Sequence, residues 1–164
     1  MKQEMRGFTI IELMVVVALV GIIASFAVPS FQTMIANSRL ASASNDLVGV
    51  VNFARAEAVK RGRSVFVSPT TGTDWADGVS VWMDTGSMDG VMQASEELRR
   101  TNAMPGDVSI TSSASAIQFT GSGMLPNGSS ATTLDLCDGR SGETGTQISV
   151  TLGGRIRAEN LPCS

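Results

Sequence analysis

The first strong pattern along the chain is an apolar run near its N-terminus. No charged residue occurs from Leu13 to Ser38, and most side chains in this stretch are Val, Leu, Ile, Ala or Phe. A helix from Phe8 to Val28 would be about 32 Å long at ~1.5 Å per residue, which matches a bilayer hydrocarbon core of about 30 Å. The run therefore predicts a membrane-spanning helix, with Glu12 as a costly charge near its start.

Beyond Pro29 the pattern changes from uniformly apolar to amphipathic. Apolar or small residues recur at three- and four-residue steps, at Leu40, Ala43 or Ser44, Leu47, Val50 or Val51, Ala54 and Ala58. This spacing predicts one buried face on a continuing helix. Lys60 and Arg61 followed by Gly62 indicate its C-terminal end. We expect a hydrophobic half at 8–34 and an amphipathic half at 35–62.

From residue 63 onward the chain has the pattern of short strands separated by turns. This part holds 13 of the 17 glycines, and alternation is clearest where Ile148, Val150 and Leu152 share one face. The expected strands are 64–68, 79–83, 108–111, 116–120, 132–136, 147–152 and 155–158. Gly153-Gly154 predicts a two-residue hairpin turn before the last strand. The pattern indicates one β-rich domain at 63–164.

The composition and net charge of the chain argue against some classes of function. The formal net charge is −3 and the chain contains no His. Without His, no Ser or Cys has its commonest activating base, so we expect no enzyme activity. The net charge does not attract nucleic acid, and any such role needs a local basic patch. Asp84, Asp89 and Gly90 lack EF-hand spacing, and we expect no metal and no cofactor.

The residues around the start of the apolar run carry a specific motif. The sequence Arg6-Gly7-Phe8-Thr9-Ile10-Ile11-Glu12-Leu13 resembles the prepilin processing site of type IV pilins and type II secretion pseudopilins. The resemblance implies that a prepilin peptidase cuts after Gly7, which removes residues 1–7 as a leader and leaves Phe8 as an N-methylated terminus. A secretory signal peptide fits less well, because no clean small-residue cleavage site follows the run.

The same resemblance implies a role for Glu12 in assembly. In the pilin families a carboxylate at this position is thought to neutralise the terminal amine of a neighbouring subunit, in lipid or in the filament core. An unpaired charge in either environment costs free energy, so the pairing would explain why a carboxylate occurs in this apolar segment.

Three further stretches of sequence indicate which family of pilins and pseudopilins the chain resembles. FARAEAVKRG at Phe53–Gly62, the segment Ile117-Gln118-Phe119 with the glycines after it, and Gly154-Arg155-Ile156-Arg157 are together similar to the GspH/FimT family of minor pilins and pseudopilins. The resemblance implies an α+β, type IV pilin-like fold, with a long N-terminal helix packed on an antiparallel β-sheet domain. It also implies a single-pass inner-membrane protein whose periplasmic C-terminal domain assembles with major and minor pilins in a pilus or pseudopilus.

The two cysteines of the chain are Cys137 and Cys163. Both lie in the part expected to be periplasmic, which is an oxidising compartment, so we expect them to form a disulfide. Closing this loop would stabilise the domain by about 3.5 kcal/mol on the chain-entropy estimate. It would also join the C-terminal tail to the strand at 132–136.

The C-terminal motif gives a candidate DNA-binding site. Arg155 and Arg157 are two residues apart, so on a strand they point to the same side about 7 Å from each other. Gly153-Gly154 keep the turn slim enough to approach a nucleic-acid backbone. The stretch is also similar to the Gly-Arg-x-Arg motif of the DNA-binding FimT proteins used in competence. Further candidates for the patch are Arg140, Arg63 and Lys60.

Three functions fit these observations. The favoured one is a minor type IV pilin that binds double-stranded DNA without sequence preference for natural transformation. The alternatives are a structural pilus-tip pilin without DNA binding and a GspH-type pseudopilin of a type II secretion system. In the alternatives, Arg155 and Arg157 only solvate an exposed strand or pair with Glu159 or Asp138.

Overall fold

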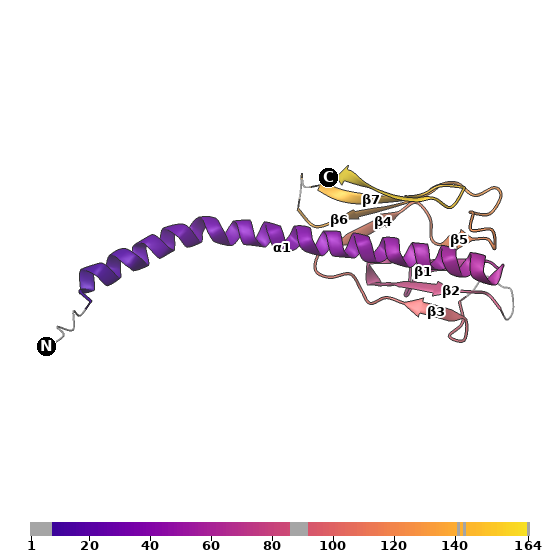
Figure 1. The fold of residues 1–164 in the computed structure, drawn as a ribbon, viewed down its shortest axis with the longest axis horizontal. Coiled ribbons are helices and arrows are strands. Elements are labelled where there is room, and N and C mark those ends of the chain that lie inside the picture. The colour runs from indigo at the N-terminus through magenta and orange to yellow at the C-terminus, as the bar shows by residue number, and fades with distance from the viewer. Residues whose placement is uncertain (1–7, 86–91, 141, 143, 164) are drawn as a thin grey trace, which may run out of the picture. The chain divides into compact units, whose positions relative to one another are not determined.

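The computed structural model of the chain describes residues 8–85, 92–140, 142 and 144–163. The elements in chain order (Figure 1) are α1 (Ile10–Arg61), β1 (Val65–Pro69), the short 3-10 helix η1 (Trp75–Asp77), β2 (Val79–Trp82), β3 (Glu97–Arg100), β4 (Ser109–Ser112), β5 (Ile117–Phe119), β6 (Thr132–Cys137), β7 (Thr144–Val150) and β8 (Ile156–Pro162). The expected leader at 1–7, including Gly7, and the pair Asp89-Gly90 lie outside the described residues.

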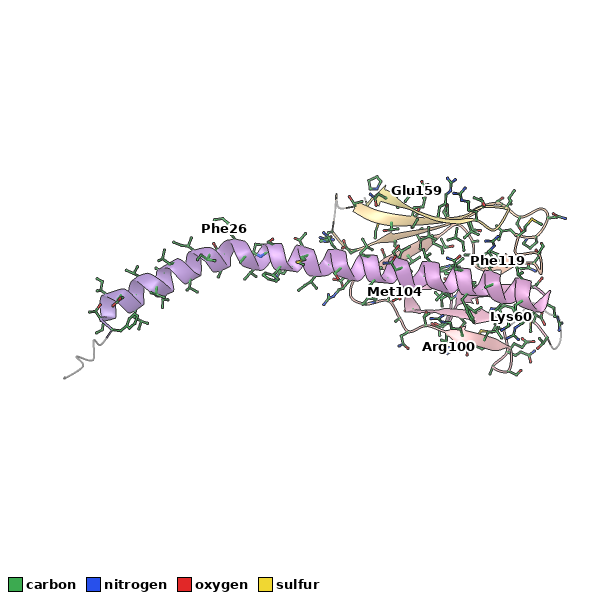
Figure 2. All side chains as sticks on the ribbon, in the orientation of Figure 1. Phe26, Lys60, Arg100, Met104, Phe119 and Glu159 are labelled. Atoms are coloured by element: carbon green, nitrogen blue, oxygen red, sulfur yellow. A yellow bond between two sulfur atoms is a disulfide. The ribbon has the colours of Figure 1, made fainter. Side chains whose placement is uncertain are left out.

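The first part of α1 is an exposed apolar helix with a capped start. Thr9 Oγ1 accepts a hydrogen bond from the backbone N–H of Glu12 at 3.3 Å, so Thr9 caps the first turn. The large apolar side chains from Phe8 to Ile35 are exposed, and Phe26 projects from the helix into open space in Figure 2. By length and composition alone, α1 is long and apolar enough to cross a membrane.

The helix continues without a break through Pro29. Thr33 Oγ1 donates a hydrogen bond to the carbonyl oxygen of Pro29 at 3.2 Å, and Ser25 Oγ donates to that of Ile22 at 2.7 Å. The hydroxyl groups of Ser25 and Thr33 are therefore satisfied by the helix itself, which lowers the cost of placing them in an apolar environment.

The compact unit that begins at Ser38 contains the second half of α1 and two four-stranded sheets. Sheet A has the order β3-β2-β1-β5, and sheet B has the order β4-β6-β7-β8. All paired strands are antiparallel, as the resemblance implied, and they are divided between two sheets.

The core of this unit lies between the helix and both sheets. The face of α1 that the spacing predicts as buried, from Leu40 to Ala58, is buried in the structure. Figure 1 shows this half of the helix lying along both sheets. Alternate residues of the strands complete the core, among them Val65, Val67 and Phe119 from sheet A and Leu134, Leu136, Ile148 and Val150 from sheet B. Every buried apolar residue among those described lies at Leu40 or later, so this core forms without the first half of α1.

One strand is not predicted by the hydrophobic pattern. β3 pairs with β2 at the edge of sheet A, and its four residues are all charged or half-exposed. Glu97 accepts a hydrogen bond from Ser80 Oγ at 2.8 Å and pairs with Arg100 at 2.6 Å. An edge strand tolerates charged side chains and is often protected by them, so alternation of apolar residues is a weak guide there.

The predicted disulfide between Cys137 and Cys163 is present, with its Cα atoms 5.9 Å apart. It joins the end of β6 to the residue after β8 and passes over β7, which lies between them. Gly145 on β7 provides the space: a Cβ there would lie 2.5 Å from Cys163 Sγ and 2.9 Å from Cys137 Sγ. The C-terminal end of the described chain is thereby fixed to β6.

Candidate functional site: a basic turn beside the end of the long helix

Two turns that contain glycine are stacked on the C-terminal end of α1. The turn Thr120–Met124, after β5, lies against the helix end so closely that a Cβ on Gly121 would be 2.5 Å from the carbonyl oxygen of Gly62. The turn between β7 and β8 packs against Thr120–Met124. The two are joined by a hydrogen bond from the N–H of Leu125 to the carbonyl oxygen of Leu152 at 3.0 Å. This stack fixes the position of the C-terminal arginine motif.

The turn between β7 and β8 is longer than predicted. The expected two-residue turn at Gly153-Gly154 is wrong: Thr151 N–H donates to the carbonyl of Arg155 at 3.0 Å, and Gly154 N–H donates to that of Thr151 at 2.8 Å. The turn therefore comprises Leu152, Gly153 and Gly154, with Gly154 in the left-handed region at φ 74°. As a result Leu152 leaves the buried face that Ile148 and Val150 keep, and lies exposed at the tip.

Gly154 is buried at the contact between the two turns. A Cβ at this position would overlap the carbonyl oxygen of Gly123 and would lie 2.9 Å from Arg55 Nε. Its positive φ also disfavours any residue with a side chain. The structure thus gives Gly154 a supporting place inside the stack, in contrast to the expected role of thinning the turn for direct approach to a ligand.

Arg155 and Arg157 are both exposed, as the alternation predicts. Ile156 between them is half-buried and packs against the core, whereas Arg155, immediately before β8, and Arg157, on β8, are exposed to solvent. The backbone of Arg155 is held at both polar groups by Thr151, whose Oγ1 accepts from Arg155 N–H at 3.2 Å. Within the described residues, the Arg155 side chain makes no ion pair or hydrogen bond.

Arg157 has one acidic neighbour on the same strand. Its Nη1 lies 3.9 Å from Glu159 Oε1, and the two side chains are 50% and 64% exposed. Figure 2 shows Glu159 at the outer edge of sheet B. An exposed pair at this separation contributes between about 0 and 1 kcal/mol, so it does not hold Arg157 away from a stronger anionic partner.

Arg140 is not brought to this surface. It follows β6 in a segment that lies beside the disulfide, where Gly142 N–H donates to the carbonyl of Cys163, at the opposite end of β8 from the turn. Its Nε and Nη2 lie 2.9 and 2.5 Å from Asp138 Oδ2. These hydrogen bonds from Arg140 lower the pKa of the Asp138 carboxyl. Asp138 is therefore a partner of Arg140. Neither residue belongs to the segment Leu152–Arg157, which we call the arginine turn.

The end of α1 adds further cations near the stack. Lys60 and Arg61 both pair with Glu57, at 3.3 and 2.6 Å, and the hydrogen bond from Arg61 is the main reason that the pKa of Glu57 is lowered. Arg63 follows the helix and is exposed. Figure 2 shows Lys60 at the C-terminal end of the helix. Two cations share one carboxylate here, so this end of the helix carries a net positive charge.

Arg55 is the basic residue at the stack that sequence reasoning missed. Its Nε donates to the carbonyl oxygen of Gly123 at 2.9 Å, across 68 residues of sequence. On the helical pattern Arg55 is only a polar residue beside the buried stripe. No local signal marks the contact, because the contact depends on how the turn after β5 packs against the helix.

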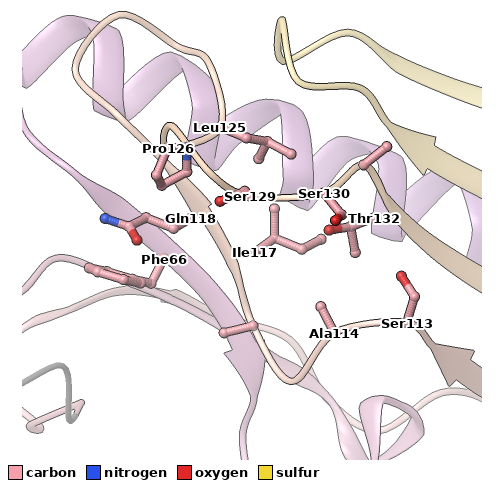
Figure 3. Close-up of a pocket in the computed structure, with 12 residues that line it drawn as sticks. Phe66, Ser113, Ala114, Ile117, Gln118, Leu125, Pro126, Ser129, Ser130 and Thr132 are labelled. Carbon is pink, nitrogen blue, oxygen red and sulfur yellow. The ribbon is translucent and has the colours of Figure 1, made fainter.

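A separate cavity of about 380 Å³ lies along the free edge of β5 (Figure 3). Its wall combines apolar side chains such as Phe66, Ile117 and Leu125 with the hydroxyl groups of Ser113 and Thr132. None of its lining residues is charged. The cavity thus offers neither a general acid–base pair nor a cation for a phosphate. In the part of the chain that the structure describes, no three His, Cys, Asp or Glu side chains gather as a metal site.

Comparison with known protein families gives two matches. The family model described as "Prokaryotic N-terminal methylation motif" matches residues 4–28. The model described as "Type II transport protein GspH" matches residues 43–154, and so covers the chain from the buried half of α1 to Gly154, the residue before Arg155.

Curated proteins such as the following two match a short stretch of the chain. The fimbrial protein EcpC of Eikenella corrodens is 47% identical over 45 residues, which are 27% of this chain and 29% of that protein. The type IV major fimbrial protein FimA of Dichelobacter nodosus is 54% identical over 41 residues, 25% of this chain and 26% of that protein. The match therefore spans little more than a quarter of these relatives.

Solved structures match over most of the chain. A crystal structure of the type IV minor pilin FimU of Pseudomonas aeruginosa has a TM-score of 0.62 at 23% identity and covers 75% of this chain and 90% of that chain. A second crystal form has a TM-score of 0.58 at 24% identity, over 72% and 90% of the two chains. At this identity the likeness shows the fold, which is the long helix packed on antiparallel sheets of a type IV pilin.

Proposed function

Because this chain belongs to the GspH family and carries the N-terminal methylation motif, we propose that it is a minor type IV pilin whose arginine turn binds double-stranded DNA. The family and the fold are those of structural pilin-type proteins and not of enzymes. Assembly with other pilins follows from that membership. DNA binding and its use in natural transformation are the further step proposed here.

Membrane anchoring and assembly both rest on the first half of α1. Its exposed apolar side chains fit lipid before assembly and other such helices afterwards. We propose cleavage after Gly7 by a prepilin peptidase, methylation of Phe8, and pairing of Glu12 with the terminal amine of a neighbouring subunit. In support of the pairing, the Glu12 carboxylate has no ion pair among the described residues. The domain at 63–164 would then lie in the periplasm until assembly.

The observation that carries the DNA proposal is the exposed Arg155 side chain on a fixed turn, with Arg157 beside it. Arginine forks match the oxygens of phosphate diesters, and such contacts are independent of base sequence. Two phosphate contacts give a slope of log affinity against log salt of about −1.8, so one subunit binds weakly at physiological salt. Several copies or neighbouring subunits would raise the effective affinity.

The test uses the full chain in a nonionic detergent and a short DNA duplex, with binding followed by fluorescence anisotropy. Arg155→Gln/Arg157→Gln is expected to abolish binding at low salt. Arg99→Gln/Arg100→Gln on β3 changes the net charge equally and is expected to leave binding intact. An equal loss of DNA affinity in both double variants would show an effect of net charge alone. If the wild type and both variants all fail to bind the duplex, the proposal is rejected.

The GspH family description supports a second candidate, a pseudopilin of a type II secretion system. The two machines differ in the subunits that surround this chain, which its own processing and assembly signals do not specify. Crosslinking in cells followed by identification of the attached pilins or secretion-system subunits distinguishes them. A structural minor pilin without DNA binding is the outcome if the arginine variants assemble normally and the wild type does not bind DNA.

A further inference from the structure

Arg55 occupies an unusual place between α1 and the arginine turn. Its Nε is anchored on the carbonyl oxygen of Gly123, and the same nitrogen would lie 2.9 Å from a Cβ on Gly154. Arg155 follows Gly154 directly, and consecutive Cα atoms are about 3.8 Å apart. The Arg55 guanidinium therefore lies beside the backbone that carries Arg155.

Most of the hydrogen-bonding capacity of Arg55 remains unused. A guanidinium has five N–H donors, and the bond from Nε to Gly123 uses one. The terminal nitrogens Nη1 and Nη2 have no partner among the described residues, and neither is a buried atom sealed from water. Arg55 as a whole is half-buried, so part of the residue remains accessible to solvent.

The charge of Arg55 is also not neutralised nearby. The acidic residue two positions along α1, Glu57, is engaged by Lys60 and Arg61. Arg55 makes no ion pair with any described residue. A cation with a fixed plane, free outer donors and no counter-charge has the properties of an anion-binding group that needs little reordering on binding.

We propose that Arg55 and Arg155 together clamp one phosphate diester of the nucleic-acid backbone, with Arg55 as a direct ligand. The inference rests on the proposed DNA-binding function and adds a site on the long helix. Gly123 and Gly154 hold the two arginines in place, the first through its carbonyl oxygen and the second by leaving room for the guanidinium. Arg157 takes an adjacent phosphate, since it lies one side-chain repeat further along β8.

The clamp makes a quantitative prediction for the wild-type protein. Because Arg55 and Arg155 share one phosphate and Arg157 takes a second, the salt slope of the wild type is about −1.8. Arg55→Gln is expected to weaken binding at low salt and to leave the slope at about −1.8, since Arg155 still neutralises the shared phosphate. Arg55→Lys keeps the charge but loses the planar fork and the Nε anchor, so it is expected to recover only part of the affinity.

If Arg55 only supported Arg155 and did not bind phosphate, Arg55→Gln would give a different salt slope when it is made in the Arg155→Gln variant. In the Arg155→Gln variant, Arg55 alone would neutralise the shared phosphate, so Arg55→Gln should reduce the salt slope there from about −1.8 to about −0.9 if Arg55 contacts phosphate itself. If Arg55 only positions Arg155, removing it from that background changes nothing. Circular dichroism spectra establish that each variant remains folded.

A direct readout is the Nε–Hε signal of Arg55 in the nuclear magnetic resonance spectrum of the full chain in detergent micelles. The bond to Gly123 slows exchange of this proton and makes the signal observable. Titration with inorganic phosphate and then with the duplex should shift it, in the wild type and in Arg155→Gln.

The outcomes separate the two proposals. DNA binding whose affinity Arg55→Gln leaves unchanged, both in the wild type and in the Arg155→Gln background, would overturn the clamp and leave the DNA-binding function standing. No DNA binding, with an Arg55 signal that still responds to phosphate, would reject the function and retain the anion site. An Arg55 signal that responds to neither ligand rejects the site.

Discussion

At the residue scale, single glycines determine whether the arginine motif is presented at all. Gly153 and Gly154 are adjacent in the sequence, yet only Gly154 has a positive φ and a crowded Cβ position. A sequence pattern treats the two as equivalent turn residues. Their difference is a tertiary one, because it comes from the contact of Gly154 with Gly123 and Arg55.

Gly154→Ala is expected to lower the free energy of unfolding by about 1–3 kcal/mol, because the added methyl group is strained by φ and overlaps Gly123. Gly153→Ala is the matched control, since nothing lies within 4 Å of its Cβ position, and its effect should stay within about 0.5 kcal/mol. Urea unfolding of both variants measures the difference. Similar stability of the two would contradict the stacked-turn geometry.

Glu159 is expected to weaken DNA binding through its contact with Arg157. Glu159→Gln should therefore raise DNA affinity by a factor of up to about five, the equivalent of ~1 kcal/mol for an exposed pair. Asp138→Asn removes the same charge at the far end of sheet B and should leave the affinity unchanged. Anisotropy titrations at one low salt concentration compare them, and an equal gain in both would point to net charge alone.

At the element scale, the sequence predicted what depends on local periodicity. The stripe from Leu40 to Ala58 and the alternation in β6 and β7 were readable because burial repeats at the period of the helix or strand. β3 was missed because its side chains are charged at a sheet edge. The β7–β8 turn was misjudged because two adjacent glycines do not define which residue adopts the left-handed conformation.

The disulfide is an element-scale contact, since it holds β6 and β8 together across β7. Cys137→Ser/Cys163→Ser is expected to lower the unfolding free energy by about 3.5 kcal/mol in urea titrations. Thiol labelling of the unfolded, unreduced wild type should find no free thiol. Stoichiometric labelling at both positions would contradict the disulfide.

The last turn of α1 makes stability depend on pH. Hydrogen bonds from Arg61 and Lys60 lower the pKa of Glu57 below its usual value of 4.5. A carboxyl with a lowered folded-state pKa stabilises the fold above its unfolded-state pKa, and this contribution is lost as pH falls through the folded-state value. The stability difference between wild type and Glu57→Gln should therefore be full at neutral pH and shrink on acidification below pH ~4.5. A difference that stays constant down to low pH would remove this explanation.

At the scale of the whole molecule, the chain combines an apolar first half of α1, whose large side chains are exposed, with a domain that has its own core. The processing proposal predicts that the mature protein lacks residues 1–7 and carries one methyl group on Phe8. Intact-mass measurement of protein from cells tests both. A mature chain that begins at Met1, or that is cut after the apolar run, contradicts it.

The pairing proposal for Glu12 predicts a separation of two functions. Glu12→Ala should leave membrane insertion intact, because it removes only a costly charge, and should reduce incorporation into filaments. Membrane fractionation and quantification in sheared filaments measure the two separately. Glu12→Gln serves as the isosteric control, and normal incorporation of both variants would refute the pairing.

The candidate site divides between what the sequence revealed and what only the folded chain brings together. The exposure of Arg155 and Arg157 followed from their spacing on a strand. The separation of Arg140 from them depends on the direction of β8 and on the pairing with Asp138, and the approach of Arg55 depends on a contact over 68 residues. These are non-local relations, which a pattern of neighbouring residues does not contain.

The disulfide over Gly145 also has a mechanical consequence for the arginine turn. Residues 137–163 form a closed covalent ring, and Arg155 lies within it. A pulling force applied at the turn cannot draw out the end of the chain, because both arms of the ring end at the same sulfur bridge. Such a force can extend the chain between the turn and the bridge only as far as the two arms of the ring reach. The tip that carries the arginines is thus joined to β6 by a covalent loop that limits its extension under load, whatever ligand it holds.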